Sequence, residues 1–315
     1  MKTVEWGFLI VNYLFLGGLS AGLFFVAALA TLFYKDGETS PSARIAQLGA
    51  WLSPWPVMLG CFLLIFDLGH WYRFYKLFLH MRLGSPMSIG SWLLVLFNLV
   101  ALTFAWAWLD AARRASLLAR LPKFVRGFNP DLSNWKRGLA AVGLPISVGV
   151  GIYTGVLLGA VQSRPFWNTN LVAQLFLFSA LSTGCAALML GFVGRETRTE
   201  ELRTLYALDI SFLTLEFFIV LPYIIHGQLS VQAVQDSLKL ILGGPYTVLF
   251  WLFFLGLGLL LPLTIEVREL FPVVVRDREF HYSRPLAAGT ALLVLGGGFL
   301  LRYIFVFAGQ VSAIQ

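Results

Sequence analysis

Eight long apolar runs dominate this sequence and limit the folds open to it. Residues 45–66 and 83–109 contain no Asp, Glu, Lys or Arg, and each exceeds the roughly twenty residues that cross a bilayer as a helix. Because 58% of residues are hydrophobic and only 12% are charged, the chain is an integral membrane protein rather than a soluble one. The sequence therefore predicts an all-α membrane fold with eight transmembrane helices, at about 6–34, 45–69, 88–110, 138–161, 170–194, 204–226, 246–266 and 286–308.

The distribution of Lys and Arg predicts the orientation in the membrane. The connections after the first, third, fifth and seventh runs hold sixteen of these residues, whereas the termini and the other connections hold six. Since loops rich in Lys and Arg stay cytoplasmic, both termini are expected in the periplasm, with the chain in a bacterial inner membrane. The net charge of +7 follows from this topology and does not indicate a nucleic-acid partner. The connection 113–137 mixes Leu, Phe and basic residues and is expected to lie along the cytoplasmic lipid headgroups.

The connection from Asp67 to Trp92, DLGHWYRFYKLFLHMRLGSPMSIGSW, gathers charged and aromatic residues between two apolar runs. Aromatic side chains settle at headgroup level, and basic ones extend to water or lipid phosphate, so residue types alone favour an interfacial anchor. Asp67 does not fit that reading, because a carboxylate so close to the hydrocarbon is expensive unless it is paired or used.

The cysteines and histidines predict no haem or metal. Cys61 and Cys185 both lie in apolar runs, and two thiols cannot make a four-thiolate iron–sulfur or zinc site. The four histidines all lie outside the middle of the runs, whereas haem in a helix bundle takes axial histidines from facing helices.

Three ionisable residues lie within the apolar runs. Asp209 and Glu216 are seven residues apart and share one helical face, and Arg302 lies in the last run. An ion pair between Glu216 and Arg302 is one interpretation. A partial proton path is the other, with Asp209 nearer the cytoplasm and Glu216 nearer the middle of the membrane.

Two runs resemble each other. LFLGGLSAG from Leu14 and LFLFSALSTG from Leu175 match once one residue is inserted, and their small residues would let helices approach closely. A duplication would divide the chain into halves 1–161 and 162–315, as two four-helix bundles. Packing stripes of small residues, which membrane helices share, explain the similarity equally well.

Several segments together carry a family resemblance. They cover nearly the whole chain, and their order and spacing resemble the NrfD/PsrC membrane subunits; the chain length and the AGQ piece are more similar to the nitrite-reductase type, NrfD. The segments are YLFLGGLSAGL from Tyr13, DLGHWYRFYKL from Asp67, SPMSIGSW from Ser85, IYTGVLLGAVQSRPFWN from Ile152, the pair Asp209 and Glu216, and RYIFVFAGQ from Arg302.

The resemblance implies a single haem-free domain, residues 1–315, that binds a quinone, menaquinone or ubiquinone, near the periplasmic face. It also implies electron exchange with a periplasmic ferredoxin-like iron–sulfur subunit, beside a further catalytic subunit. Tyr153 stands at the position of the family's quinone-binding tyrosine. Tyr13 stands roughly where shorter members have a histidine, and Asn12 is an alternative polar contact. A glutamate of those members aligns with either Asp67 or His70.

Two classes of function remain open. The first is a quinol-dependent oxidoreductase subunit, with a quinone pocket at the periplasmic ends of the first, second and fourth helices, where Tyr, His and an acid beside an apolar slot suit quinone chemistry. The second is a secondary transporter, suggested by the internal similarity and the intramembrane charges. A transporter would bind its substrate near the midplane, whereas most polar candidates here gather at one face.

Overall fold

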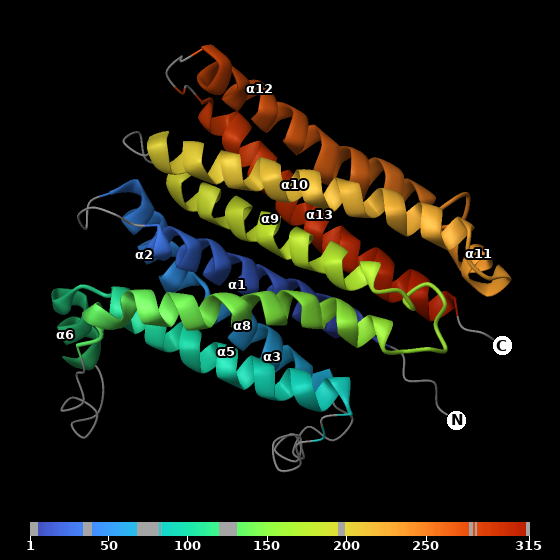
Figure 1. Ribbon diagram of the computed structural model, residues 1–315, viewed down its shortest axis with the longest axis horizontal. Helices are drawn as coiled ribbons and strands as arrows, with labels where there is room; N and C mark the ends of the chain where they lie inside the picture. The colour runs from blue at the N-terminus through green and yellow to red at the C-terminus, as the bar shows by residue number, and fades with distance from the viewer. Residues whose placement is uncertain are drawn as a thin grey trace.

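A computed structural model describes residues 6–33, 40–67, 82, 84–119, 131–194, 199–276, 280 and 282–312, with only the backbone of Asp67 and Arg276. Eight helical segments in these ranges are long and apolar enough to cross a membrane, which confirms the predicted number. Figure 1 shows them running roughly side by side. They are α1 (Phe8–Leu32), α2 with α3 (Pro41–Leu52, Pro54–Asp67), α5 (Pro86–Trp108), α8 (Lys136–Gly159), α9 (Leu171–Val193), α10 (Thr199–Gln228), η3 with α12 (Leu249–Leu260, Leu261–Arg276) and α13 (Arg284–Val311).

Span 2 is interrupted, although its sequence predicted a continuous helix. The break lies at Ser53, between α2 and α3. Pro54 has no N–H to donate to the carbonyl oxygen of Ala50 four residues earlier, and the hydroxyl of Ser53 donates to that oxygen instead, at 3.3 Å. The hydroxyl of Ser20 in α1 donates to the carbonyl oxygen of Ser53. Local side chains thus satisfy the backbone groups at the break, as a membrane interior requires.

Helix α1 packs against α2, α3, α8, α9 and α13 and occupies the centre of the molecule. Its closest approach is to α9, where a Cβ added at Gly22 would lie 1.9 Å from the carbonyl oxygen of Ala180. A Cβ at Gly184 would lie 2.3 Å from the carbonyl carbon of Gly22. The two similar segments of the sequence therefore cross each other through their glycines. The division into two four-helix bundles stays a prediction.

The two ends of the described chain meet at one end of the molecule (Figure 1). The backbone N–H of Trp6 donates to Gln310 Oε1 at 2.7 Å, and Gln310 Nε2 donates to the carbonyl oxygen of Trp6 at 2.9 Å. The Trp6 ring stacks on Trp167 with centroids 5.1 Å apart, and Trp167 Nε1 donates to the carbonyl oxygen of Phe305 at 2.6 Å. We call this the clasp end; it also carries the short helix α11 (Gln232–Leu238).

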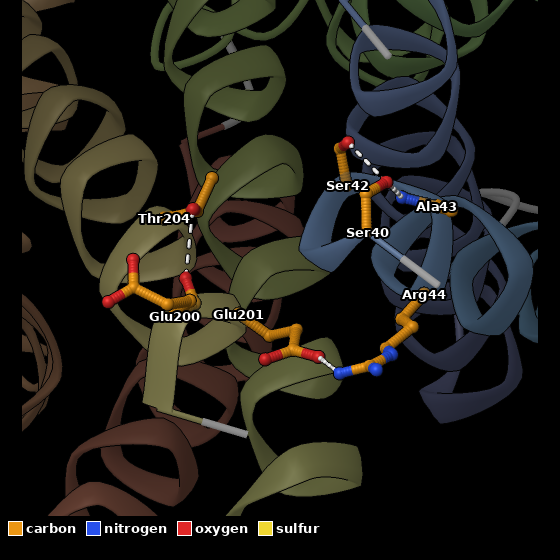
Figure 2. A network of polar contacts seen from close by, with 7 residues as sticks. All are labelled: Ser40, Ser42, Ala43, Arg44, Glu200, Glu201 and Thr204. Carbon is orange, nitrogen blue, oxygen red and sulfur yellow. Dashed lines mark hydrogen bonds and ion pairs between the residues drawn. The ribbon is translucent and has the colours of Figure 1, made fainter. Parts of the chain in front are cut away.

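The opposite end carries the starts of α2 and α10 and the short helix α6 (Ala111–Ala119) (Figure 1). We call it the basic end, because its connections hold most of the Lys and Arg residues. Arg44 Nη1 and Glu201 Oε1 form an ion pair here at 2.9 Å, which joins α2 to α10 (Figure 2). The Glu201 side chain is only 1% exposed. The pair therefore links the first half of the chain to the second.

Candidate functional site

Tyr13, Cys61, Gly90 and Tyr153 meet near the clasp end, and we call them the tyrosine site. They come from α1, α3, α5 and α8, and each lies four to six residues from the clasp end of its helix. At a rise of about 1.5 Å per residue, this places them roughly 6–9 Å inside the bundle. The phenol groups of Tyr13 and Tyr153 lie near each other, and Cys61 lies close to both. The structure therefore brings together the two tyrosines predicted from sequence and adds Gly90 of α5, the third membrane span.

Gly90 sets the position of the Tyr153 ring. A Cβ added at Gly90 would fall 1.7 Å from Tyr153 Cζ and 2.1 Å from its Oη. The phenol thus lies directly against the backbone of α5, in space that any other residue at position 90 would occupy. Tyr153 is 8% exposed and Cys61 is partly exposed.

The hydroxyl of Tyr13 is buried and makes no hydrogen bond to any described residue. Tyr13 is only 2% exposed, and a buried polar group left without a partner costs about 1–3 kcal/mol. A small acceptor beside Tyr13 and Tyr153, such as a carbonyl oxygen, would satisfy this donor. The tyrosine site therefore suits a ligand that accepts hydrogen bonds in an otherwise apolar setting.

The structure supports the other residues predicted for this pocket less well, or does not describe their side chains. The Nδ2 of Asn12 donates to the carbonyl oxygen of Phe8 at 2.8 Å, one turn back on its own helix, so this donor is already used. Asp67 is the last residue of α3, at the clasp end, and its side chain is not described. His70 lies outside the described residues. Only Tyr13 and Tyr153 among the predicted pocket residues can thus be seen to meet.

A second group of polar residues lies buried in the other half of the chain. Glu216 and Asp209 of α10, Glu266 of α12 and Arg302 of α13 are all 2% exposed or less, and we call them the charged cluster. Charged groups at this depth in a membrane protein are rare and face the bundle interior. Three of these four residues, Asp209, Glu216 and Arg302, were singled out in the sequence, and the role proposed for them there stays a prediction.

Arg302 is held by hydroxyl and carbonyl groups. Its Nη1 donates to Ser179 Oγ at 2.6 Å and to the carbonyl oxygen of Gly298 at 2.8 Å, and its Nη2 donates to the carbonyl oxygen of Phe176 at 3.0 Å. Ser182 Oγ donates to Glu216 Oε2 at 3.5 Å. Among the described residues, Glu216 and Arg302 form no direct ion pair within 4.0 Å. The two serines of α9 therefore stand between the acid and the base.

Asp209 faces a carboxyl group that was not predicted from the sequence. Glu266 lies opposite it on α12, and the carboxyl oxygens of both residues have no hydrogen-bond partner within the described parts of the chain. Glu269, one turn further toward the basic end, lies near the hydroxyl of Tyr206. We placed the end of span 7 at residue 266, but α12 continues to Arg276. The spacing of Glu266 and Glu269 by three residues on one face of the segment TIEVREL could have signalled them.

Helix α1 separates the tyrosine site from the charged cluster. Tyr13 turns toward α3 and α8, whereas a Cβ at Gly18 would lie 3.0 Å from Arg302 Nη2. Five residues correspond to about 140° around a helix, so the two positions lie on well-separated faces of α1. The cluster also extends from Arg302, in the half nearer the clasp, toward Glu269 near the basic end. The arrangement offers hydrogen-bond donors at one site and a row of proton-binding groups at the other.

The described residues contain no group of three or more His, Cys, Asp or Glu side chains that could hold a metal ion. His70, His80 and His281 lie outside the described residues, and His226 lies near the end of α10. The expected absence of haem and metal therefore stays a prediction.

Comparison with known proteins gives a consistent result along the whole chain. The family model described as "Polysulphide reductase, NrfD" matches residues 1–314. The C polypeptide of polysulfide reductase from Wolinella succinogenes is 33% identical, with 98% of this sequence and 95% of the relative covered. Protein NrfD of Escherichia coli is 32% identical, with 99% of this sequence and 96% of that protein covered. The C polypeptide of selenate reductase from Mesobacillus selenatarsenatis is 29% identical, over 83% of this sequence and 66% of that protein. The first two identities are nearly equal, so a closer relation to the nitrite-reductase type stays a prediction.

Proposed function

The chain belongs to the NrfD family, and the relatives named above include subunits of polysulfide and selenate reductases. We propose that it is the quinone-binding membrane subunit of a bacterial respiratory oxidoreductase. The observation that carries this proposal is the unpartnered, buried hydroxyl of Tyr13 beside Tyr153, where four helices converge. A phenol is a hydrogen-bond donor, and a quinone carbonyl is an acceptor.

The bound quinone or quinol, menaquinone or ubiquinone, supplies two-electron chemistry coupled to two protons. In the proposal, Tyr153 and Tyr13 donate hydrogen bonds that fix the ring, and Gly90 and Cys61 form its wall. Asp67, at the end of α3, exchanges protons with the water at the clasp end, and His70 is the alternative for that role. Asn12 is a weaker candidate, because its amide donor is already bound to its own helix.

The clasp end is proposed to face the periplasm. The basic-end connections hold sixteen Lys and Arg residues, whereas the termini and the clasp-end connections hold six, and this difference supports the orientation in a bacterial inner membrane. A periplasmic ferredoxin-like iron–sulfur subunit would then contact the clasp end, with a further catalytic subunit beyond it. The shallow position of the tyrosine site, roughly 6–9 Å inside the bundle, keeps the distance for electron transfer short.

The charged cluster is proposed to move protons between the membrane interior and the basic end. Asp209 and Glu216 lie two turns apart on one face of α10, and the carboxyl oxygens of Asp209 lack described partners. Buried carboxyl groups of this kind bind and release protons through intervening water. Arg302, held by Ser179, would fix the charge at the far end of the row.

Quinol-dependent turnover of the purified complex tests the pocket. Tyr153→Phe keeps the ring and removes only the donor, so quinol affinity should fall about two- to tenfold, the effect of losing a hydrogen bond worth roughly 0.5–1.5 kcal/mol. Asp67→Asn should retain affinity better and lower the maximal rate. Tyr303→Phe is the control, because Tyr303 belongs to the half of α13 nearer the clasp end, and α13 contributes no residue to the tyrosine site.

Loss of quinol affinity in Tyr153→Phe but not in Tyr303→Phe would support the pocket. Wild-type affinity and rate in both Tyr153→Phe and Asp67→Asn would remove the pocket from the tyrosine site. A purified chain without an iron–sulfur partner, but with a substrate bound at the charged cluster, would favour the secondary transporter instead.

A further inference from the structure

A cavity at the basic end is distinct from both sites described above. It has a volume of about 160 Å³ and lies between α2, α5 and the end of α9. At about 30 Å³ per water molecule in the liquid, this is room for a handful of waters or one compact polar group. Two of the lining residues are exposed, Trp51 at 48% and the Arg113 side chain at 70%. It therefore lies at the surface of the helix bundle, near the level of the lipid headgroups.

Two arginines, Arg44 and Arg113, line the cavity. Arg44 Nη1 donates to the buried carboxylate of Glu201 at 2.9 Å (Figure 2). The other N–H groups of its guanidinium can donate to a further acceptor. Arg113 is 70% exposed and lies 3.8 Å from Asp110, which is itself 57% exposed. Exposed pairs of this kind are weak. Arg113 can therefore exchange Asp110 for another anion.

The rest of the lining is apolar or aromatic except for Gln47, whose Nε2 donates to the carbonyl oxygen of Trp108 at 3.4 Å. Leu48, Ala105, Leu109 and Phe192 line the cavity beside Trp51. A free inorganic anion would gain nothing from these side chains. A phosphate that carries a glycerol backbone and acyl chains would place its charge at the arginines and its apolar part against the apolar side chains.

We propose that this cavity binds the phosphate of an anionic glycerophospholipid. Arginine suits phosphate because its planar N–H groups match the oxygens in pairs, and basic pockets between transmembrane helices bind the headgroups of anionic lipids. A third cationic side chain lies nearby, because the Lys136 ammonium is 4.3 Å from the centre of the Trp108 ring, and Trp108 lines the cavity. The lipid lies at the junction that Arg44 and Glu201 make between the two halves of the chain, and it stabilises that junction.

Native mass spectrometry of the delipidated protein tests this proposal. The probes are short-chain phosphatidylglycerol, short-chain phosphatidylcholine and inorganic phosphate, each titrated separately. We expect phosphatidylglycerol to bind in preference to the other two. Arg113→Ala should weaken phosphatidylglycerol binding about tenfold, because it removes a charge-assisted hydrogen-bond donor. Arg203→Ala is the matched control, since Arg203 is 46% exposed at the same end, is similarly paired with Glu200 at 3.6 Å and does not line the cavity.

A second variant keeps every charge in place. Ala105→Phe fills the cavity and should abolish phosphatidylglycerol binding, while the unfolding temperature measured without lipid shows that the bundle is intact. Added phosphatidylglycerol should raise the unfolding temperature of the wild type and of Arg203→Ala but not of Ala105→Phe.

Three outcomes would overturn the proposal. One is equal binding of phosphatidylglycerol and phosphatidylcholine, which would show that the cavity does not recognise the net negative charge of the lipid. Another is inorganic phosphate that binds as tightly as phosphatidylglycerol and makes the acyl chains irrelevant. The third is phosphatidylglycerol binding unchanged in both Arg113→Ala and Ala105→Phe, which would place the lipid elsewhere.

Discussion

Gly90→Ala is the most direct test of how the tyrosine site is built. The added Cβ would lie 1.7 Å from Tyr153 Cζ, where ordinary contacts begin at 3.4 Å. The ring or α5 must therefore move by roughly 2 Å, which exceeds the 0.5–1 Å gap that already weakens packing. Overpacking of this size costs about 1–3 kcal/mol of stability. A hydrogen bond that needs the phenol within about 3 Å of its acceptor is lost at the same time.

The expected kinetic result is a two- to tenfold loss of quinol affinity, the magnitude for one neutral hydrogen bond. It is measured as quinol-dependent turnover of the assembled complex, over a range of quinol concentrations. Gly289→Ala is the control, because no atom lies within 4 Å of a Cβ at this position in α13. That change should leave turnover unaltered.

A double-mutant cycle identifies the cause. If Gly90→Ala acts by displacing the phenol, then adding Tyr153→Phe should reduce affinity little further. Fully additive losses would show that Gly90 acts through something other than Tyr153. Wild-type affinity in an assembled Gly90→Ala complex would refute the reasoning, because the phenol would then not need its present position.

Three further predictions follow from the other features. Glu216→Gln should lower proton uptake or turnover more than complex assembly, because a neutral amide cannot bind a proton; a variant that only loses folded complex would leave Glu216 with a purely structural role. Reporter fusions at Gln315 should be active only in the periplasm, given the charge bias, and cytoplasmic activity would reverse the orientation. The isolated subunit should show no Soret absorbance, and a band that stays with the protein through purification would contradict the expectation of a haem-free chain.

The number of spans could be predicted because bilayer thickness fixes the length of an uncharged helix. The boundaries of α1 and α9 agree with the predicted runs to within two residues. Span 7 was less accessible, since Glu266 and Glu269 mark the end of an apolar run in sequence but continue a helix in the structure. Carboxyl groups that face the bundle interior do not end a membrane helix, and hydropathy alone cannot tell which way they face.

The tyrosine site was predictable only in part. Sequence and family resemblance indicated Tyr13 and Tyr153, and their helix ends were expected to converge. The contribution of Gly90 was not visible, because it depends on how α5 is rotated and how closely it approaches α8. Glycine has no side chain to signal such a contact. The small residues around Gly22 and Gly184 were easier to interpret, because several of them recur in one segment.

The hydrogen bonds between Trp6 and Gln310 have a consequence for how the protein is made. These residues are 304 positions apart, so the bonds cannot form until α13 has been synthesised and has entered the membrane. Until then α1 lacks its partner α13, and the face of α1 around Gly18, which Arg302 of α13 covers in the finished fold, is exposed to lipid or to insertion factors. A chain truncated before α13 leaves that surface uncovered, which gives membrane quality control a means of distinguishing unfinished copies from finished ones.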